Sequence, residues 1–226
     1  AIELEDDNTL IGAAITDGGS DVMLFGSGGK VIRFKESDVR AMGRTARGVR
    51  GIKLAAKQRV ISLIIPEENG ELLIASENGY GKRSRLEDYS VIGRGGQGVI
   101  SITLSERNGK AISAVRVQDG DEIMLISKGG TLVRTRVDEI RTMGRNTQGV
   151  RLIRLQEGET LVGLQRIDEL EDQESDVVEG EVVEGEVIDS KVSEDETNSS
   201  EKIDADTSKS NESEEDQAKP DGDSGE

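Results

Sequence analysis

Apolar residues come in short runs that end at glycine turns and recur along the chain. Residues 22–33 read VMLFGSGGKVIR, residues 72–83 read LLIASENGYGKR, and residues 123–134 read IMLISKGGTLVR. Each stretch predicts a β-hairpin, because an apolar strand leads through a glycine turn into a second strand that ends in arginine. VMLF and IMLI are apolar at consecutive positions, so we expect these strands to be buried on both faces, as in stacked blades.

A second motif follows each hairpin at a constant distance. The sequences GRTARGV, GRGGQGV and GRNTQGV begin at Gly43, Gly93 and Gly144, at steps of 50 and 51 residues. We call them box 1, box 2 and box 3. A fixed period near 50 is typical of repeat architectures, and four short strands per period fit a propeller blade. The sequence therefore predicts an all-β, β-pinwheel or propeller-like array of four-stranded blades, with a helical turn at most in SDVRAM, EDYSVI and DEIRTM.

The period also predicts how the chain is divided. We expect a folded domain over residues 1–170 with three full repeats at about 10–55, 60–105 and 111–155, and a partial unit at each end. Exchange of a strand between adjacent units would complete the partial ones. The partial units and the missing initial methionine indicate a piece of a longer array.

Charge separates the folded part from an acidic tail. The 226 residues carry a formal net charge of −17, but residues 171–226 hold 22 acidic and 4 basic residues, a net of −18. The remaining 24 acidic and 25 basic residues lie in 1–170, a net of +1. High charge and few apolar residues predict that 171–226 is disordered. This tail is either a solubility segment or a regulatory one that contacts the basic rim of the array.

Composition excludes several classes of function. The chain has no cysteine and no histidine, so thiolate metal sites and histidine-dependent hydrolase chemistry are excluded. We assign no catalytic residue and no metal ligand. No apolar run approaches the roughly 20 residues that cross a bilayer, and no signal peptide opens the chain, which predicts a cytoplasmic protein without membrane contact.

Basic residues recur at one place in each repeat. An arginine follows the first glycine of every box, although a turn explains the glycines alone and needs no charge there. Recurring bases predict positive bands on the rim, which suit a polyanion; a solvated face with internal ion pairs is the alternative. Aromatic residues are 2% of the chain and tryptophan is absent, so stacking on single strands is disfavoured. We therefore predict contacts to the backbone of duplex DNA, with little sequence preference and strong salt dependence.

The predicted DNA-binding residues come from the boxes and the hairpin arms. They are Lys30, Arg33, Lys35, Arg44, Arg47, Lys82, Arg83, Arg85, Arg94, Gly95, Gly96, Arg134, Arg136 and Arg145. Six of them stand at equivalent positions, so we expect these six to be mostly exposed along one outer edge: Arg33, Arg44, Arg83, Arg94, Arg134 and Arg145.

The repeats resemble those of the C-terminal DNA-wrapping domain, or β-pinwheel, of bacterial DNA gyrase A. The resemblance rests on VMLFGSGGKVIRFKESDVRAMGRTARGVRGIKL, ENGYGKR and GTLVRTRVDEIRTMGRNTQGV, and covers about residues 1–170. The family's full box, Q-R-R-G-G-[KR]-G, belongs to its first blade and is absent here. GRGGQG is its nearest degenerate copy.

The resemblance implies a part of an ATP-dependent type IIA topoisomerase that bends DNA around a basic rim and supports negative supercoiling. It implies gyrase B and the N-terminal part of gyrase A as partners in an A2B2 complex associated with the chromosome. ATP and Mg²⁺ would act elsewhere in that complex, with no cofactor in this chain. The alternatives are the equivalent domain of topoisomerase IV and a protein-binding propeller of kelch or chromatin-regulator type.

Overall fold

A computed structural model describes residue 4 and residues 8–167, and the predicted acidic tail lies outside these residues. The regular structure consists of short strands and three one-turn 3₁₀ helices, labelled η. The elements are β1 (Asp21–Gly26), β2 (Lys30–Lys35), η1 (Glu36–Asp38), β3 (Val60–Ile64), β4 (Glu71–Ser76), β5 (Tyr80–Arg85), η2 (Leu86–Asp88), β6 (Val99–Ile100), β7 (Ala111–Val117), β8 (Glu122–Ser127), β9 (Leu132–Arg136), η3 (Val137–Glu139), β10 (Val150–Arg151) and β11 (Leu161–Ile167).

The all-β prediction is confirmed, since no α-helix occurs in the part of the chain that the structure describes. The three predicted hairpins are the antiparallel pairs β1–β2, β4–β5 and β8–β9. Each hairpin runs directly into one of the 3₁₀ turns, η1, η2 or η3, where the sequence allowed a helical turn. No helix among the described residues is long and apolar enough to cross a membrane.

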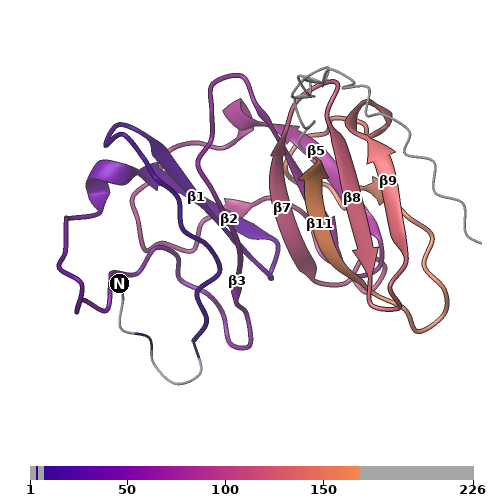
Figure 1. The fold of residues 1–226 in the computed structure, drawn as a ribbon, viewed down its shortest axis with the longest axis horizontal. Coiled ribbons are helices and arrows are strands. Elements are labelled where there is room, and N and C mark those ends of the chain that lie inside the picture. Colours follow the sequence, from indigo (N-terminus) through magenta and orange to yellow (C-terminus); the bar gives the residue numbers. More distant parts are fainter. Residues whose placement is uncertain (1–3, 5–7, 168–226) are drawn as a thin grey trace, which may run out of the picture. The chain divides into compact units, whose positions relative to one another are not determined.

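Each hairpin is completed by strands that come later in the chain. The first sheet has the order β3-β1-β2-β6, and the second has the order β10-β5-β4-β7. β3 and β7 each lead into the next hairpin, whereas β6 and β10 follow boxes 2 and 3. The third sheet has the order β11-β8-β9 within the described residues, and Figure 1 shows β11 running along β8. The repeats therefore exchange strands with their neighbours.

Burial on both faces was expected for VMLF and IMLI, but the apolar residues of β1 and β8 are alternately buried and half-buried. The strand that is buried on both faces is β4 of the second sheet. Leu72 and Ile74 belong to a core cluster with Met23 and Phe25 of the first sheet. Leu73 and Ala75, which alternate with them along β4, belong to a cluster with residues of the third sheet such as Leu125. Because alternate side chains of a strand point to opposite faces, one strand supplies both cores. Burial of each large apolar side chain stabilises the stack by about 1.5–3 kcal/mol.

Candidate nucleic-acid interface

The last glycine of box 2 and of box 3 lies against the hairpin of the preceding repeat. Gly98 has φ +71°, and a Cβ atom built there would lie 2.2 Å from the carbonyl oxygen of Val31. Gly149 has φ +79°, and its Cβ would lie 2.5 Å from the carbonyl oxygen of Gly81. Glycine is therefore required by both the backbone conformation and the close approach of the strand that follows each box. This explains why the glycine recurs.

Replacement of Gly149 by alanine should lower the free energy of unfolding by at least about 2 kcal/mol, because left-handed strain and a backbone collision add. The matched control is Gly144→Ala, since a Cβ at Gly144 meets nothing within 4 Å. Urea unfolding followed by circular dichroism would measure both variants. Equal losses for the two variants would contradict the close-approach explanation.

Box 2 and box 3 each lie beside the segment that follows the previous box. Box 2 is held by hydrogen bonds from the Gly95 N–H to the Gly51 carbonyl (2.6 Å) and from the Lys53 N–H to the Gly96 carbonyl (2.8 Å). Box 3 repeats the second of these bonds, since the Thr103 N–H donates to the Thr147 carbonyl at 2.9 Å. We call boxes 1–3 together with segments 50–53 and 100–103 the box ladder.

The box arginines hold the box ladder together as well as carrying its charge. Arg94 Nη1 donates to the carbonyl of Arg50 at 2.7 Å, and Arg145 Nη1 donates to the carbonyl of Ile100 at 3.3 Å. Both side chains are half-buried, whereas Arg44 in box 1 is exposed. Arg94 Nε donates in addition to the carbonyl of Asp38 at 3.2 Å. A guanidinium has five N–H donors, so these bonds use two N–H groups of Arg94 and one of Arg145. The other N–H groups of the two side chains can donate to an anion.

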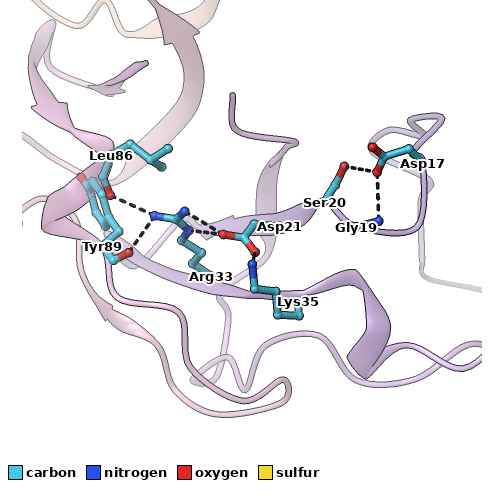
Figure 2. A network of polar contacts seen from close by, with 8 residues as sticks. All are labelled: Asp17, Gly19, Ser20, Asp21, Arg33, Lys35, Leu86 and Tyr89. Atoms are coloured by element: carbon cyan, nitrogen blue, oxygen red, sulfur yellow. Dashed lines mark hydrogen bonds and ion pairs between the residues drawn. The ribbon is translucent and has the colours of Figure 1, made fainter. Parts of the chain in front are cut away.

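The hairpin arginines form ion pairs within their own hairpins. Arg33 Nε and Nη2 both lie 2.7 Å from Asp21 Oδ2, as Figure 2 shows. Its Nη1 donates to the carbonyls of Leu86 (3.2 Å) and Tyr89 (3.1 Å), in and directly after η2. Arg33 thus links the first hairpin to the turn that follows the second. Burial raises the pKa of Asp21, but hydrogen bonds from Lys35 and Arg33 outweigh it and hold that pKa below its usual value.

The same acid–arginine pair recurs in the other two hairpins at different degrees of burial. Arg83 pairs with Glu71, and Arg134 pairs with Glu122. The exposed fraction of the arginine side chain is 18% for Arg33, 10% for Arg83 and 60% for Arg134. The expectation that all six equivalent arginines are mostly exposed is therefore wrong for Arg33 and Arg83. Cross-strand carboxylates and backbone carbonyls bind their guanidinium groups.

Lys82 is fully buried and lies beneath the backbone of box 3, to which it donates hydrogen bonds. Its Nζ donates to the carbonyls of Gly144 (2.6 Å) and Arg145 (2.5 Å). Desolvation lowers the pKa of Lys82 from 10.5 to about 8. The ammonium group is enclosed in the fold, so Lys82 acts on the box ladder as a positioning residue, and the exposed phosphate contact expected from the sequence does not fit this placement.

The stability of the chain should depend on Lys82 between pH 8 and 10.5. Its folded pKa, about 8, lies below the unfolded value of 10.5, so the unfolded chain binds more protons in this window. The contribution of Lys82 to the free energy of unfolding therefore increases as the pH rises from 8 to 10.5 and decreases as the pH falls through the same range. Relative to Lys82→Met, the wild type should gain about 2–3 kcal/mol between pH 7 and 10.5, measured by urea unfolding. A constant difference across this range would contradict the buried lysine.

The other predicted residues lie at the surface or close to it. Lys30 and Gly95 are half-buried, and Lys30 Nζ donates to Gln97 Oε1 of box 2 at 3.2 Å. The exposed members are Lys35, Arg47, Arg85, Gly96 and Arg136. Lys35 lies 2.7 Å from Asp21 Oδ1, and Arg136 lies 3.1 Å from Glu139. The box residues come together on the box ladder, whereas the bases of the hairpin arms mostly serve their own hairpins.

Two exposed arginines, one in the box ladder and one directly after it, were not among the DNA-binding residues predicted from the sequence. Arg50 and Arg151 occupy the same position, directly after the G-V that closes box 1 and box 3. The recurring GVR of those two repeats is the signal that identifies them. No group of three or more His, Cys, Asp or Glu in the described part of the chain is arranged to hold a metal ion.

A family model described as DNA gyrase C-terminal domain, beta-propeller, matches residues 20–67, 70–118 and 121–168. DNA gyrase A of Pseudomonas aeruginosa is 61% identical over 169 residues, which cover 75% of this chain and 18% of that protein. DNA gyrase A of Escherichia coli is 55% identical over 174 residues, covering 77% of this chain and 20% of that protein. The chain thus spans about a fifth of the length of these relatives.

Two solved structures share the architecture. A DNA gyrase A C-terminal domain matches with a TM-score of 0.68 at 30% identity, over 74% of this chain and 57% of that one. The C-terminal domain of a DNA topoisomerase IV matches with a TM-score of 0.70 at 23% identity, over 74% of this chain and 52% of that one. At this identity the match shows a common fold alone. Each stretch that the family model matches holds one hairpin, one box and the long strand after it, β3, β7 or β11. The three stretches make up well over half of the chain, which therefore belongs to the DNA gyrase C-terminal domain family of beta-propellers.

Proposed function

We propose that the chain binds duplex DNA along the box ladder, mainly through phosphate contacts, and bends it. The observation that carries this proposal is the joining of successive boxes by hydrogen bonds, from box 2 to segment 50–53 and from box 3 to segment 100–103. A charged group that recurs once per repeat is thereby brought to successive positions along one surface. A DNA backbone has charges spaced regularly along its length, so a ladder of arginines suits it better than a compact ligand does.

The chemistry of the box ladder favours the backbone over the bases. Residues 43–53, 93–103 and 144–154 contain arginine, lysine, glycine and small polar side chains but no aromatic residue. Bases cannot stack there, and no helix is present in these segments to enter a groove. Bending 20–30 base pairs costs on the order of 1–6 kcal/mol, which several phosphate contacts per repeat can offset.

The whole-protein function follows from the family as part of the same proposal. We infer that the intact protein is a gyrase A, part of a type IIA, ATP-dependent topoisomerase that acts with gyrase B in an A2B2 complex on the chromosome, in the cytoplasm. ATP and Mg²⁺ would be used outside this chain. Both relatives described above are gyrase A proteins, which favours gyrase over topoisomerase IV and over a protein-binding propeller.

Fluorescence anisotropy with two unrelated duplexes of equal length tests the proposal. Both should bind with similar affinity, and the affinity should fall steeply between about 50 and 200 mM salt. Arg44→Gln with Arg50→Gln should reduce the slope of log affinity against log salt by about 2. The matched control is Lys110→Gln with Lys128→Gln, which removes the same charge from exposed loops outside the box ladder. Absence of binding to either duplex, or equal slopes for both double variants, would contradict the proposal.

A further inference from the structure

Two arginines contact Tyr80 at the turn end of the second hairpin, at one end of the box ladder, and a third arginine lines the same pocket. Tyr80 begins β5 and is buried. The Arg107 guanidinium carbon lies 4.7 Å from the centre of its ring, and that of Arg151 lies 5.4 Å from it. Arg151 Nη2 also donates to Tyr80 Oη at 2.9 Å. With Arg154, these residues line an open pocket of about 480 Å³.

The pocket is positively charged and its lining carries no carboxylate. Besides Tyr80 and the three arginines, its lining consists of Leu152 and Ile153. An adjoining hollow extends to Glu159, but the Ser127 hydroxyl and the Gln156 N–H donate to that carboxylate. Within the described residues, Arg107 and Arg154 make no ion pair. Three like charges at one open pocket attract an anion.

The tyrosine ring orients the arginines. Hydrogen bonds from Arg107 and Arg151 lower the pKa of Tyr80, so the phenol oxygen and both guanidinium groups are drawn together. A guanidinium that lies over an aromatic face keeps its N–H edge free for an anion in its own plane. The arginines are therefore held in place before a ligand arrives, which lowers the entropic cost of binding.

This cluster is not part of the pattern that recurs in each repeat. Around the first hairpin, Lys30, Ile100 and Thr103 stand at the positions that Tyr80, Arg151 and Arg154 occupy around the second hairpin. Only one of these three residues is cationic, and Lys30 donates to Gln97. The cluster is therefore a feature of the second hairpin alone, and the period that explains the boxes does not explain it.

We propose that Arg107, Arg151 and Arg154 around Tyr80 form a phosphate-binding site. Arginine suits this ligand because its planar N–H edge matches two phosphate oxygens. Resting on the proposed function, we assign the phosphate to the backbone of the bound duplex, which would extend the DNA contact from the box ladder onto the second hairpin. A free oligophosphate has the same chemistry and is the other source of such a group.

The site has a built-in reporter. The chain has two tyrosines and no tryptophan, and Tyr89 is buried with its hydroxyl 3.0 Å from Ser101 Oγ. A change in tyrosine fluorescence on addition of inorganic tripolyphosphate therefore reports on Tyr80. We expect a saturable change in the wild-type chain and in Lys110→Gln with Lys128→Gln. Arg107→Gln with Arg154→Gln should bind at least tenfold more weakly, while Arg107→Lys with Arg154→Lys should restore part of the affinity.

A second arm uses duplex DNA and anisotropy with the same variants. The double variant Arg107→Gln with Arg154→Gln should lower the slope of log affinity against log salt by about 2. The control variant Lys110→Gln with Lys128→Gln should leave this slope unchanged. Urea unfolding of each variant shows whether the folded state is retained. If Arg107→Gln with Arg154→Gln is unfolded, Arg107→Lys with Arg154→Lys still tests the loss of the planar guanidinium edge, because it keeps the charge.

The outcomes separate the site from the proposed function. No saturable fluorescence change in the wild type, or an equal change in the glutamine pair, overturns the phosphate site. A fluorescence response with DNA binding unaltered by the glutamine pair overturns the assignment to DNA and leaves a site for free oligophosphates. If the wild type responds to tripolyphosphate but binds no duplex, the proposed function fails and the phosphate site stands.

Discussion

Arg83→Ala should lower the free energy of unfolding by about 3–5 kcal/mol, because it removes one partner of a largely buried ion pair. Arg83 Nη1 lies 3.1 Å from Glu71 Oε2 and 2.7 Å from Asp119 Oδ1. Asp119 is exposed, so most of the loss comes from Glu71, whose carboxylate would keep only the Thr142 hydroxyl among these partners. Urea unfolding followed by circular dichroism measures the effect.

The equivalent arginines of the other hairpins are matched controls. Arg134 is largely exposed, so Arg134→Ala should cost at most about 1 kcal/mol. Arg33→Ala should fall between the two, because Lys35 still lies 2.7 Å from Asp21 after the change. Equal losses for Arg83→Ala and Arg134→Ala would show that burial does not set the size of the effect. Under conditions where it is folded, Arg83→Ala should bind DNA as the wild type does.

The repeat architecture was predictable because its signals are local and recur. Glycine turns define the three hairpins, and the structure confirms all three. Burial on both faces was expected from VMLF and IMLI, but alternate apolar residues of these two strands are only half-buried, and β4 is the strand that contributes to two cores. The strand exchange was expected from the partial units, but the assignment of β6 to the first hairpin and β10 to the second depends on contacts more than 60 residues apart.

The candidate site was less predictable, because a basic residue in a strand does not show which face it occupies. Arg33 and Arg83 were expected at the rim, although in each hairpin an acidic residue precedes the arginine by 12 positions. That spacing brings the two side chains together near the open end of the hairpin, as in Asp21–Arg33. Lys82 is harder to identify, since the carbonyls that accept its hydrogen bonds belong to box 3, in the following repeat.

Removal of residues 171–226 should raise the affinity for duplex DNA by more than tenfold at low salt. The change takes the formal charge from −17 to about +1 and leaves every residue of the box ladder in place. If the tail is the regulatory segment, it would compete with DNA for the same arginines at an effective concentration in the millimolar range, and salt would screen this competition. The gain should therefore shrink as salt is raised from about 50 to 200 mM.

Two control chains distinguish charge from length and sequence in this experiment. A tail with every Asp and Glu replaced by Asn and Gln should bind DNA like the truncated chain, since the competing charge is gone. A tail of scrambled order but unchanged composition should bind like the full chain, because competition by a polyanion needs no particular sequence. Anisotropy at the two salt concentrations measures all four chains. Equal affinities of the full and truncated chains at low salt would show that the tail does not compete for the box ladder and serves solubility instead.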